Sequence, residues 1–189
     1  GNAELLLRSN LTRYQVEIAS VIQGSAQSLL TIINDILDFS RMEAGEVSLR
    51  ATPFDLILLL EELGGILAPE AYGKGLEFHI MYPLNGVHTV IGDSGRIRQI
   101  LLNLIGNAIK FTDQGYVLLR CEQDGGSLVF TVTDTGIGIP QDKQERVFER
   151  FQQADSSMTR IYGGAGLGLA ISKQLAFWMG GEIRLESEA

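Results

Sequence analysis

Two amides and one ammonium recur at helical spacing in the stretch RQILLNLIGNAIKFT, which spans residues 98–112. Asn103, Asn107 and Lys110 stand at i, i+4 and i+7, so they share one face of a helix. A carboxamide oxygen can ligate a hard cation, and an ammonium can meet a phosphate as a point charge. The same residue types also suit an ordinary solvated surface, so this helix alone leaves both interpretations open.

An apolar stripe on another side of the same helix would hold these groups in place. The helical spacing predicts that this stripe faces a core, and its members are Ile97, Leu101, Leu104 and Ala108. The preceding GDSG turn supplies Asp93 or Ser94 as a cap for the helix start.

The first glycine cluster is DTGIGIP, at residues 134–140. Asp134 ends an expected strand, and a buried carboxylate there needs a hydrogen-bond partner. Gly136 and Gly138 tolerate positive φ and let a flat ring approach the backbone. An Asp-Thr-Gly turn without any ligand is the alternative for this cluster taken by itself.

The second glycine cluster is YGGAGLGLAIS, at residues 162–172. Four glycines, Gly163, Gly164, Gly166 and Gly168, form a loop that opens a helix, and free N–H groups at such a start bind phosphate oxygens. No G-K-[ST] follows, so this is not a P-loop. The strand and spacing of a dinucleotide-binding fingerprint are absent too.

These stretches, together with RVFERFQQAD at 146–155, occur in an order that closely resembles the catalytic, ATP-binding domain of sensor histidine kinases. That domain belongs to the superfamily of gyrase, Hsp90 and MutL, and IINDILDFSRMEAG is similar to the hybrid type of sensor kinase. The resemblance implies an α/β two-layer sandwich, with a mixed, largely antiparallel sheet and helices on one face. It also implies ATP and Mg²⁺ as the bound molecules.

The resemblance assigns a role to each site residue. Asp134 would accept a hydrogen bond from the adenine amino group, Asn107 would ligate Mg²⁺, and Lys110 would contact phosphate. Asn103 would lie near the phosphates, or else be a helix-face amide bonded to water. The implied nucleotide-binding set is Asn103, Asn107, Lys110, Asp134, Gly136, Gly138, Arg160, Tyr162, Gly164, Gly166, Leu167 and Gly168.

A polar stretch without periodicity, Gln152–Tyr162, lies between the glycine clusters and is an expected lid. Phe148 and Phe151 would anchor its base, and Tyr162 would pack near the ribose or base. Arg160 resembles a lid arginine that reaches phosphate, although a solvated arginine fits equally. Ala165 stands where the family usually has threonine, which predicts reduced affinity rather than lost binding.

The N-terminal part, Glu4–Arg41, has the pattern of one long helix. Its apolar stripe needs a partner, and its members are Tyr14, Ile18, Val21, Ile22, Leu29, Ile32, Ile33, Ile36 and Phe39. The helix resembles the second helix of a dimerisation hairpin, which pairs two chains in a four-helix bundle; packing on its own domain is the alternative. MEAGEV would be a hinge, so we expect a dimerisation helix over 1–46 and a catalytic domain over 47–189.

The family's phosphoacceptor pattern, S-H-E-x-R-T-P, is absent. The only histidines are His79 and His88, both in strand-like segments, so we expect a fragment that begins after the phosphoacceptor. The resemblance implies transfer of a γ-phosphoryl group to a histidine outside this chain and relay to a response-regulator receiver. Asn103 replaces the general-base glutamate of the gyrase and MutL branches, which disfavours hydrolysis. A degenerate kinase that acts as a dimerising interaction module is the other hypothesis.

The remaining pattern consists of short elements. We expect a break at 52–53, a helix over Phe54–Ala71 and a hairpin turn at 124–126. The expected strands are Val47–Arg50, Leu76–Tyr82, His88–Ile91, Tyr116–Glu122, Ser127–Thr133 and Glu182–Ala189, the last without the usual following strand.

Composition narrows the class of protein. The chain has 189 residues, a net charge of −8 and a pI of about 4.8, so it lacks the basic footprint of a nucleic-acid binder. The single cysteine, Cys121, fits a reducing compartment and a place in the core. The absence of a signal peptide and of a long apolar run predicts a cytoplasmic segment without membrane contact.

Overall fold

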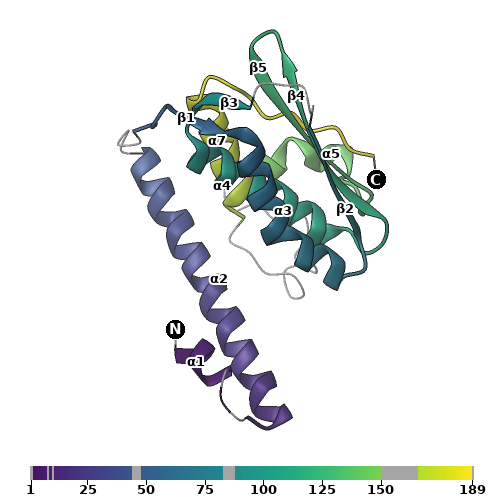
Figure 1. Cartoon of the computed structure of the whole chain (residues 1–189). Helices are drawn as coiled ribbons and strands as arrows, with labels where there is room; N and C mark the ends of the chain where they lie inside the picture. Colours follow the sequence, from purple (N-terminus) through teal and green to yellow (C-terminus); the bar gives the residue numbers. More distant parts are fainter. Residues whose placement is uncertain are drawn as a thin grey trace.

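The computed structural model describes residues 2–7, 9, 11–43, 48–82, 88–149 and 166–188. Figure 1 shows an N-terminal helical arm and a body in which helices lie against a sheet. In chain order the described elements are α1 (Asn2–Leu7), α2 (Arg13–Glu43), β1 (Thr52–Asp55), α3 (Leu56–Gly73), β2 (Glu77–Met81), β3 (Thr89–Gly92), α4 (Ser94–Phe111), β4 (Tyr116–Asp124), β5 (Ser127–Asp134), α5 (Gln141–Gln144), the 3-10 helix η1 (Arg146–Phe148) and α7 (Gly168–Trp178). The predicted α/β class with a mixed sheet is confirmed.

The arm consists of two helices, so the prediction of one helix over Glu4–Arg41 is wrong. Thr12 and Gln15 form a reciprocal capping box at the start of α2. The Thr12 backbone N–H donates to Gln15 Oε1 (2.9 Å), and the Gln15 N–H donates to Thr12 Oγ1 (3.3 Å). Because this pair satisfies donors that a helix start leaves free, a new helix begins there. Periodicity missed the break because apolar residues recur at helical spacing on both sides of it.

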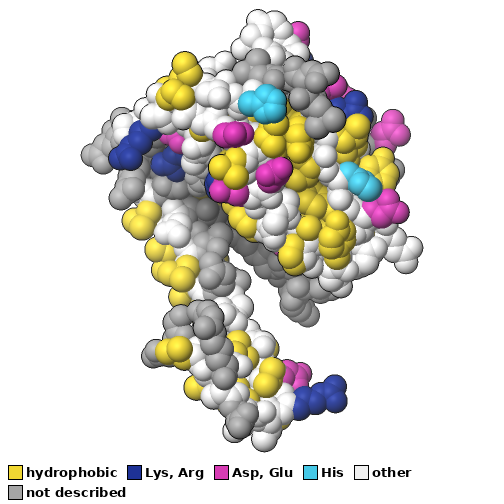
Figure 2. Space-filling view, in the orientation of Figure 1, with side chains coloured by type: hydrophobic (Ala, Val, Ile, Leu, Met, Phe, Trp, Pro, Cys, Tyr) yellow, Lys and Arg dark blue, Asp and Glu magenta, His cyan; other side chains and the backbone are white. Residues whose placement is uncertain are grey.

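The arm exposes much of the apolar stripe of α2, and hydrophobic side chains are visible along it in Figure 2. The large exposed apolar side chains of α2 are Tyr14, Val16, Ile18, Val21, Ile22, Leu29, Leu30, Ile33, Ile36 and Leu37. An exposed apolar surface of this kind marks an interaction site. Within the described ranges, no helix combines the length and apolar character needed to span a membrane.

The first strand begins later than the sequence predicts. Residues 48–50 form no strand, and β1 runs through Pro53, which faces Ile91 of β3 in an antiparallel pair. The prediction of a break at this proline is therefore wrong. A two-stranded sheet has a free edge on each strand, and an edge tolerates a residue that lacks an N–H.

Asp55 sets the start of α3. Its Oδ1 accepts hydrogen bonds from the backbone N–H groups of Ile57 (2.9 Å) and Leu58 (3.1 Å). An aspartate in this position satisfies the free donors of the first turn, so the helix begins at Leu56 rather than at the predicted Phe54.

The described strands form two sheets. β1 pairs with β3, whereas β4 lies between β2, to which it is parallel, and β5, to which it is antiparallel. The predicted hairpin turn is confirmed, with Gly125 and Gly126 at φ values of 54° and 102° between the strands. The hairpin carries Asp134 to the end of β5, opposite Val117 of β4.

The C-terminal segment is not the strand predicted over Glu182–Ala189. In the described part of the chain, residues 181–188 join no strand ladder. Ser187 is held by side-chain contacts instead: its Oγ accepts from the Ile139 N–H (2.9 Å), and its carbonyl oxygen accepts from Gln144 Nε2 (2.8 Å). These bonds hold the segment against the loop that follows β5 and against α5.

Helix α4 lies in the middle of the helical layer, between α3 and α7, as Figure 1 shows. Its buried residues are Ile100, Leu101, Ile105, Ala108 and Ile109. Of the predicted inner positions, Leu101 and Ala108 are buried, while Ile97 and Leu104 are half-buried. The prediction was incomplete because α4 divides its apolar surface between the α3 and sheet side and the α7 side.

Cys121 lies in the main core on β4 and is 1% exposed. Burial, and secondly the charge of Glu122, raises the pKa of its thiol to about 11. The neutral thiol therefore stabilises the folded state fully below the pKa that Cys121 has in the unfolded chain, and this contribution disappears as the pH rises toward 11.

We expect Cys121 to resist iodoacetamide at pH 8 in the native protein and to react in urea. Equal reaction rates in both states would contradict its burial.

Candidate nucleotide-binding site

One open cleft collects most of the predicted site residues. It is long, and it is lined by α4, by β1, β3 and β5, by the loop after β5, by the α5–η1 segment, by α7 and by the C-terminal segment. The predicted residues that line it are Asn103, Asn107, Lys110, Asp134, Gly136, Gly138, Gly166 and Gly168. Within it, Gly168 lies directly against Asn103, and Gly136 lies directly against the Phe111 carbonyl at the end of α4.

The other predicted residues stand apart from this group. Leu167 is 1% exposed and packs in a hydrophobic cluster with Ile171 and Leu175, so only its backbone can reach a ligand. Arg160, Tyr162 and Gly164, with the lid stretch 152–162, Phe151 and Ala165, lie outside the described residues. Phe148 lines the cleft, and the Lys173 ammonium lies 4.8 Å from its ring centroid.

Of the two predicted caps, Asp93 and Ser94, it is Asp93 that fixes the start of α4. Its Oδ1 accepts from the Arg96 N–H (3.1 Å), which caps the helix, and its Oδ2 accepts from the Arg50 backbone N–H (2.9 Å). Burial acts to raise the pKa of Asp93, but these backbone bonds and the Arg96 charge outweigh it, and the pKa lies below its usual value. One carboxylate thus joins the segment before β1 to the helix that carries Asn107.

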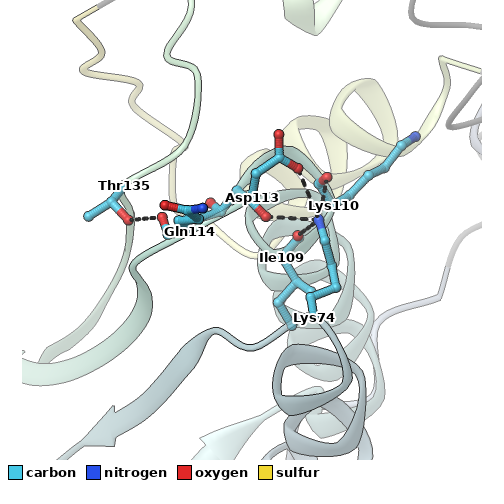
Figure 3. A network of polar contacts seen from close by, with 7 residues as sticks. Lys74, Ile109, Lys110, Asp113, Gln114 and Thr135 are labelled. Atoms are coloured by element: carbon cyan, nitrogen blue, oxygen red, sulfur yellow. Dashed lines mark hydrogen bonds and ion pairs between the residues drawn. The ribbon is translucent and has the colours of Figure 1, made fainter.

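The end of α4 is capped by a lysine that directly follows another helix. The sequence patterns did not predict this contact. Lys74 follows α3, and its ammonium donates to the carbonyl oxygens of Ile109 (2.8 Å), Lys110 (3.0 Å) and Thr112 (2.8 Å). Figure 3 shows this ammonium at the helix end, with the carboxylate of Asp113 3.9 Å away. A cation at this place satisfies free carbonyl groups and complements the helix dipole.

Replacing Lys74 with methionine keeps the aliphatic stem and removes these three bonds. We expect the variant to lose about 1–3 kcal/mol of unfolding free energy, because hydrogen bonds from charged donors are among the stronger ones. Urea unfolding measures the change. Lys74→Arg, which keeps a charged donor, should retain most of the stability. A Lys74→Met variant as stable as the wild type would show that the cap is not needed.

Asp134 lies exposed at the end of β5, so the expectation of a buried carboxylate is wrong, and its Oδ1 accepts from the Gly136 N–H (2.9 Å). Its neighbour Thr135 orients the loop: the Thr135 Oγ1 accepts from the Tyr116 N–H (3.0 Å) and donates to the Gln114 carbonyl (3.2 Å). Figure 3 shows the contact between Thr135 and Gln114. Thr135 had no predicted role, although its place inside the DTG motif was a signal.

Gly136 and Gly138 differ in why they must be glycine. A Cβ at Gly136 would lie 2.5 Å from the Phe111 carbonyl oxygen and 2.9 Å from Asp134 Oδ1. Gly138 has a φ of 67°, in the left-handed region. The first glycine lets the loop pack against the end of α4, and the second lets the chain turn.

Lys110 reaches the cleft from the last turn of α4. Its ammonium lies 5.0 Å from the Phe111 ring centroid, and burial lowers its pKa. Phosphate oxygens nearby would favour the charged form and oppose this shift. The two histidines are elsewhere: His79 and His88 are exposed, and neither belongs to the residues that line the cleft.

The fold and this cleft define an ATP-binding domain of the histidine kinase type, and comparisons with known proteins agree. Residues 92–189 match the family described as "Histidine kinase-, DNA gyrase B-, and HSP90-like ATPase". The chain belongs to this family. Residues 1–45 match the "His Kinase A (phospho-acceptor) domain" family.

The relatives include hybrid sensor kinases. The chain is 44% identical over 196 residues to the hybrid signal transduction protein dokA of Dictyostelium discoideum, covering 99% of this chain and 12% of dokA. It is 42% identical over 193 residues to the signal transduction histidine-protein kinase BarA of Escherichia coli K12, covering 100% of this chain and 21% of BarA. The chain thus spans about a tenth to a fifth of the length of these two relatives.

Two solved histidine kinase structures share the fold of this chain. The crystal structure of full-length ShkA in complex with AMPPNP superposes with a TM-score of 0.75 at 40% identity, over 95% of this chain and 37% of ShkA. The Acinetobacter baumannii histidine kinase AdeS shares the fold, with a TM-score of 0.68 at 20% identity, over 89% of this chain and 75% of AdeS. The resemblance to hybrid sensor kinases and the assignment as part of a histidine kinase are confirmed.

Proposed function

We propose that this chain is the catalytic, ATP-binding region of a two-component sensor histidine kinase. It binds Mg-ATP and transfers the γ-phosphoryl group to a histidine outside this chain, for relay to a response-regulator receiver. The observation that carries the proposal is that Asn107, Lys110, Asp134 and the end of the second glycine cluster line one open cleft, in which Gly168 lies against Asn103 and Gly136 against the end of α4. Residues 1–45, which match the phospho-acceptor family, contain no histidine.

The side chains fit Mg-ATP chemically. Among the described residues, neither Asn107 Oδ1 nor the second carboxylate oxygen of Asp134 accepts a hydrogen bond. One is free to ligate a cation and the other to accept from an adenine amino group. Bound Mg²⁺ would supply charge stabilisation to the phosphate oxygens. The complex of ShkA with AMPPNP, an ATP analogue, supports the same ligand here.

The residues of the cleft favour transfer to an external nucleophile over hydrolysis. Lys110 and the N–H groups at the start of α7 bind and orient phosphate oxygens. Asn103, one turn before Asn107, is an amide, which cannot remove a proton from water at neutral pH. The chain therefore supplies positioning and charge stabilisation without a general base at this place.

We further propose a dimerisation helix over residues 1–46 and a catalytic domain over 47–189, within a cytoplasmic region of the parent protein. The exposed apolar residues of α2 support pairing with a second copy in a helical bundle. Solution mass at high concentration tests this pairing. The double variant Val21→Glu and Leu29→Glu should be monomeric, whereas a wild-type chain that stays monomeric would contradict the proposal.

The function is tested by calorimetric titration of the chain with Mg²⁺ and a non-hydrolysable ATP analogue. Saturable binding that is weakened by Asn107→Ala is expected. A histidine-bearing hairpin is then added with ATP, and acid-labile phosphate on it would establish transfer. No analogue binding by a folded sample would favour the other hypothesis, a degenerate kinase that acts as a dimerising interaction module. Sustained phosphate release abolished by Asn107→Ala would favour an ATPase.

A further inference from the structure

Three side chains from two helices form a chain of hydrogen bonds at the wall of the cleft. Asn103 Nδ2 on α4 donates to Ser172 Oγ on α7 (2.9 Å). Asn107 Nδ2 donates to Asn103 Oδ1 (3.4 Å), the longer of the two bonds. Both ends of the Asn103 carboxamide therefore have protein partners.

The surroundings pack closely around the Asn103 carboxamide. Ser172 is 2% exposed, so its hydroxyl is a fixed partner inside the protein. Gly168, one turn earlier on α7, lies so close that a Cβ there would be 2.3 Å from Asn103 Oδ1. The carboxamide is thus held between the two helices, and its nitrogen faces Ser172.

In this arrangement the Ser172 hydroxyl, which can donate or accept, accepts from Asn103, and the donors and acceptors of the three side chains run in one direction. Because the Asn103 nitrogen is used by Ser172, its oxygen faces Asn107 and accepts from the Asn107 nitrogen. The Asn107 oxygen must then point away from Asn103. Only the oxygen of a carboxamide can ligate a cation, so this orientation decides whether Asn107 can serve as a ligand.

We propose that Ser172 is a positioning residue that sets the orientation of the Asn107 carboxamide through Asn103, so that the oxygen faces the bound metal. This inference rests on the proposed binding of Mg-ATP. It gives Asn103 a role other than the direct phosphate contact that the sequence suggested. It also links the helix that follows the second glycine cluster to the metal ligand on α4.

The test compares Ser172→Ala with the wild-type chain by calorimetry, using a non-hydrolysable ATP analogue with Mg²⁺ and again with EDTA. We expect affinity with Mg²⁺ to fall about tenfold, as for the loss of one buried hydrogen bond, and affinity in EDTA to change less than about twofold. Asn103→Ala should behave in the same way, and the double variant should lose no more than Asn103→Ala.

Thr112→Val is the matched control, because the Thr112 Oγ1 is buried and has no hydrogen-bond partner among the described residues. It should leave both affinities unchanged. A second readout needs no nucleotide: the side-chain NH₂ signals of ¹⁵N-labelled Asn107 should shift in Ser172→Ala and stay in place in Thr112→Val.

Equal losses with Mg²⁺ and with EDTA would mean that Ser172 acts through packing alone, and this would overturn the inference. Unchanged affinity, or unchanged Asn107 signals, would overturn it as well. Failure of the wild-type chain to bind the analogue under any condition would instead overturn the proposed function, and the inference with it. Urea unfolding of each variant verifies that the protein is folded.

Discussion

Replacing Asp134 with asparagine is expected to weaken binding of a Mg-ATP analogue by about 30- to 150-fold, or about 2–3 kcal/mol. The variant keeps an oxygen for the Gly136 N–H, so the loop should hold its shape. The second carboxylate oxygen becomes an NH₂ group, which would face the adenine amino group donor to donor. A strong acceptor is lost and an unpaired donor takes its place.

Calorimetry measures the loss, and Asp142→Asn is the control. Asp142 lies in α5, close in sequence to the same loop, and its replacement removes the same charge without touching Asp134. It should bind the analogue nearly as well as the wild type. An inosine analogue, whose O6 accepts hydrogen bonds, should bind Asp134→Asn relatively better. Equal losses in both variants would point to general electrostatics and against adenine recognition by Asp134.

Replacing Gly136 with alanine is expected to destabilise the folded chain by about 2–3 kcal/mol. The new methyl group would lie 2.5 Å from the Phe111 carbonyl oxygen and 3.0 Å from the Phe111 carbonyl carbon. Both atoms belong to the backbone at the end of α4, so neither can move aside at low cost. The bond from the Ile137 N–H to the same carbonyl (3.3 Å) would be displaced too.

Urea unfolding measures this change, with Gly65→Ala as the matched control. Gly65 lies inside α3, and a Cβ there would meet nothing within 4 Å. Alanine should therefore stabilise the helix by about 0.5–1 kcal/mol, because it loses less backbone freedom on folding. Opposite signs for the two substitutions are the expected result. If Gly136→Ala is as stable as the wild type, the loop does not depend on this close approach.

Local patterns were sufficient for the parts of the fold that depend on neighbouring residues. The polar face of α4, the hairpin turn before Ser127 and the cap by Asp93 all follow from side-chain periodicity or turn chemistry within a few positions. The site residues that line the cleft could also be predicted from local sequence, because each lies in a short motif. The family resemblance then indicated which motifs belong together.

Contacts across the fold could not be predicted in this way. Lys74 stands in a plain G-K-G turn, and only the packing of α3 beside α4 brings its ammonium to three carbonyl groups. Ser172 is an ordinary helix residue in the sequence, and only the packing of α7 beside α4 places it next to Asn103. A strand needs a ladder partner, which the pattern at 182–189 does not reveal. The break before α2 was readable as T-x-x-Q, but the apolar repeat concealed it.

The paired contacts of Asp93 have a consequence for chimeric kinases. In the segment before β1, the donor to Asp93 is the backbone N–H of Arg50. This hydrogen bond is therefore independent of the side chain at position 50. A foreign helical arm can therefore be grafted before Ser48 with almost any sequence. The hydrogen bond from the backbone N–H at position 50 to Asp93 should form again. Proline at position 50 is the exception, since it has no N–H to donate. A graft with that single change would keep the cleft side chains that follow Ser48 but would lose the hydrogen bond between position 50 and Asp93.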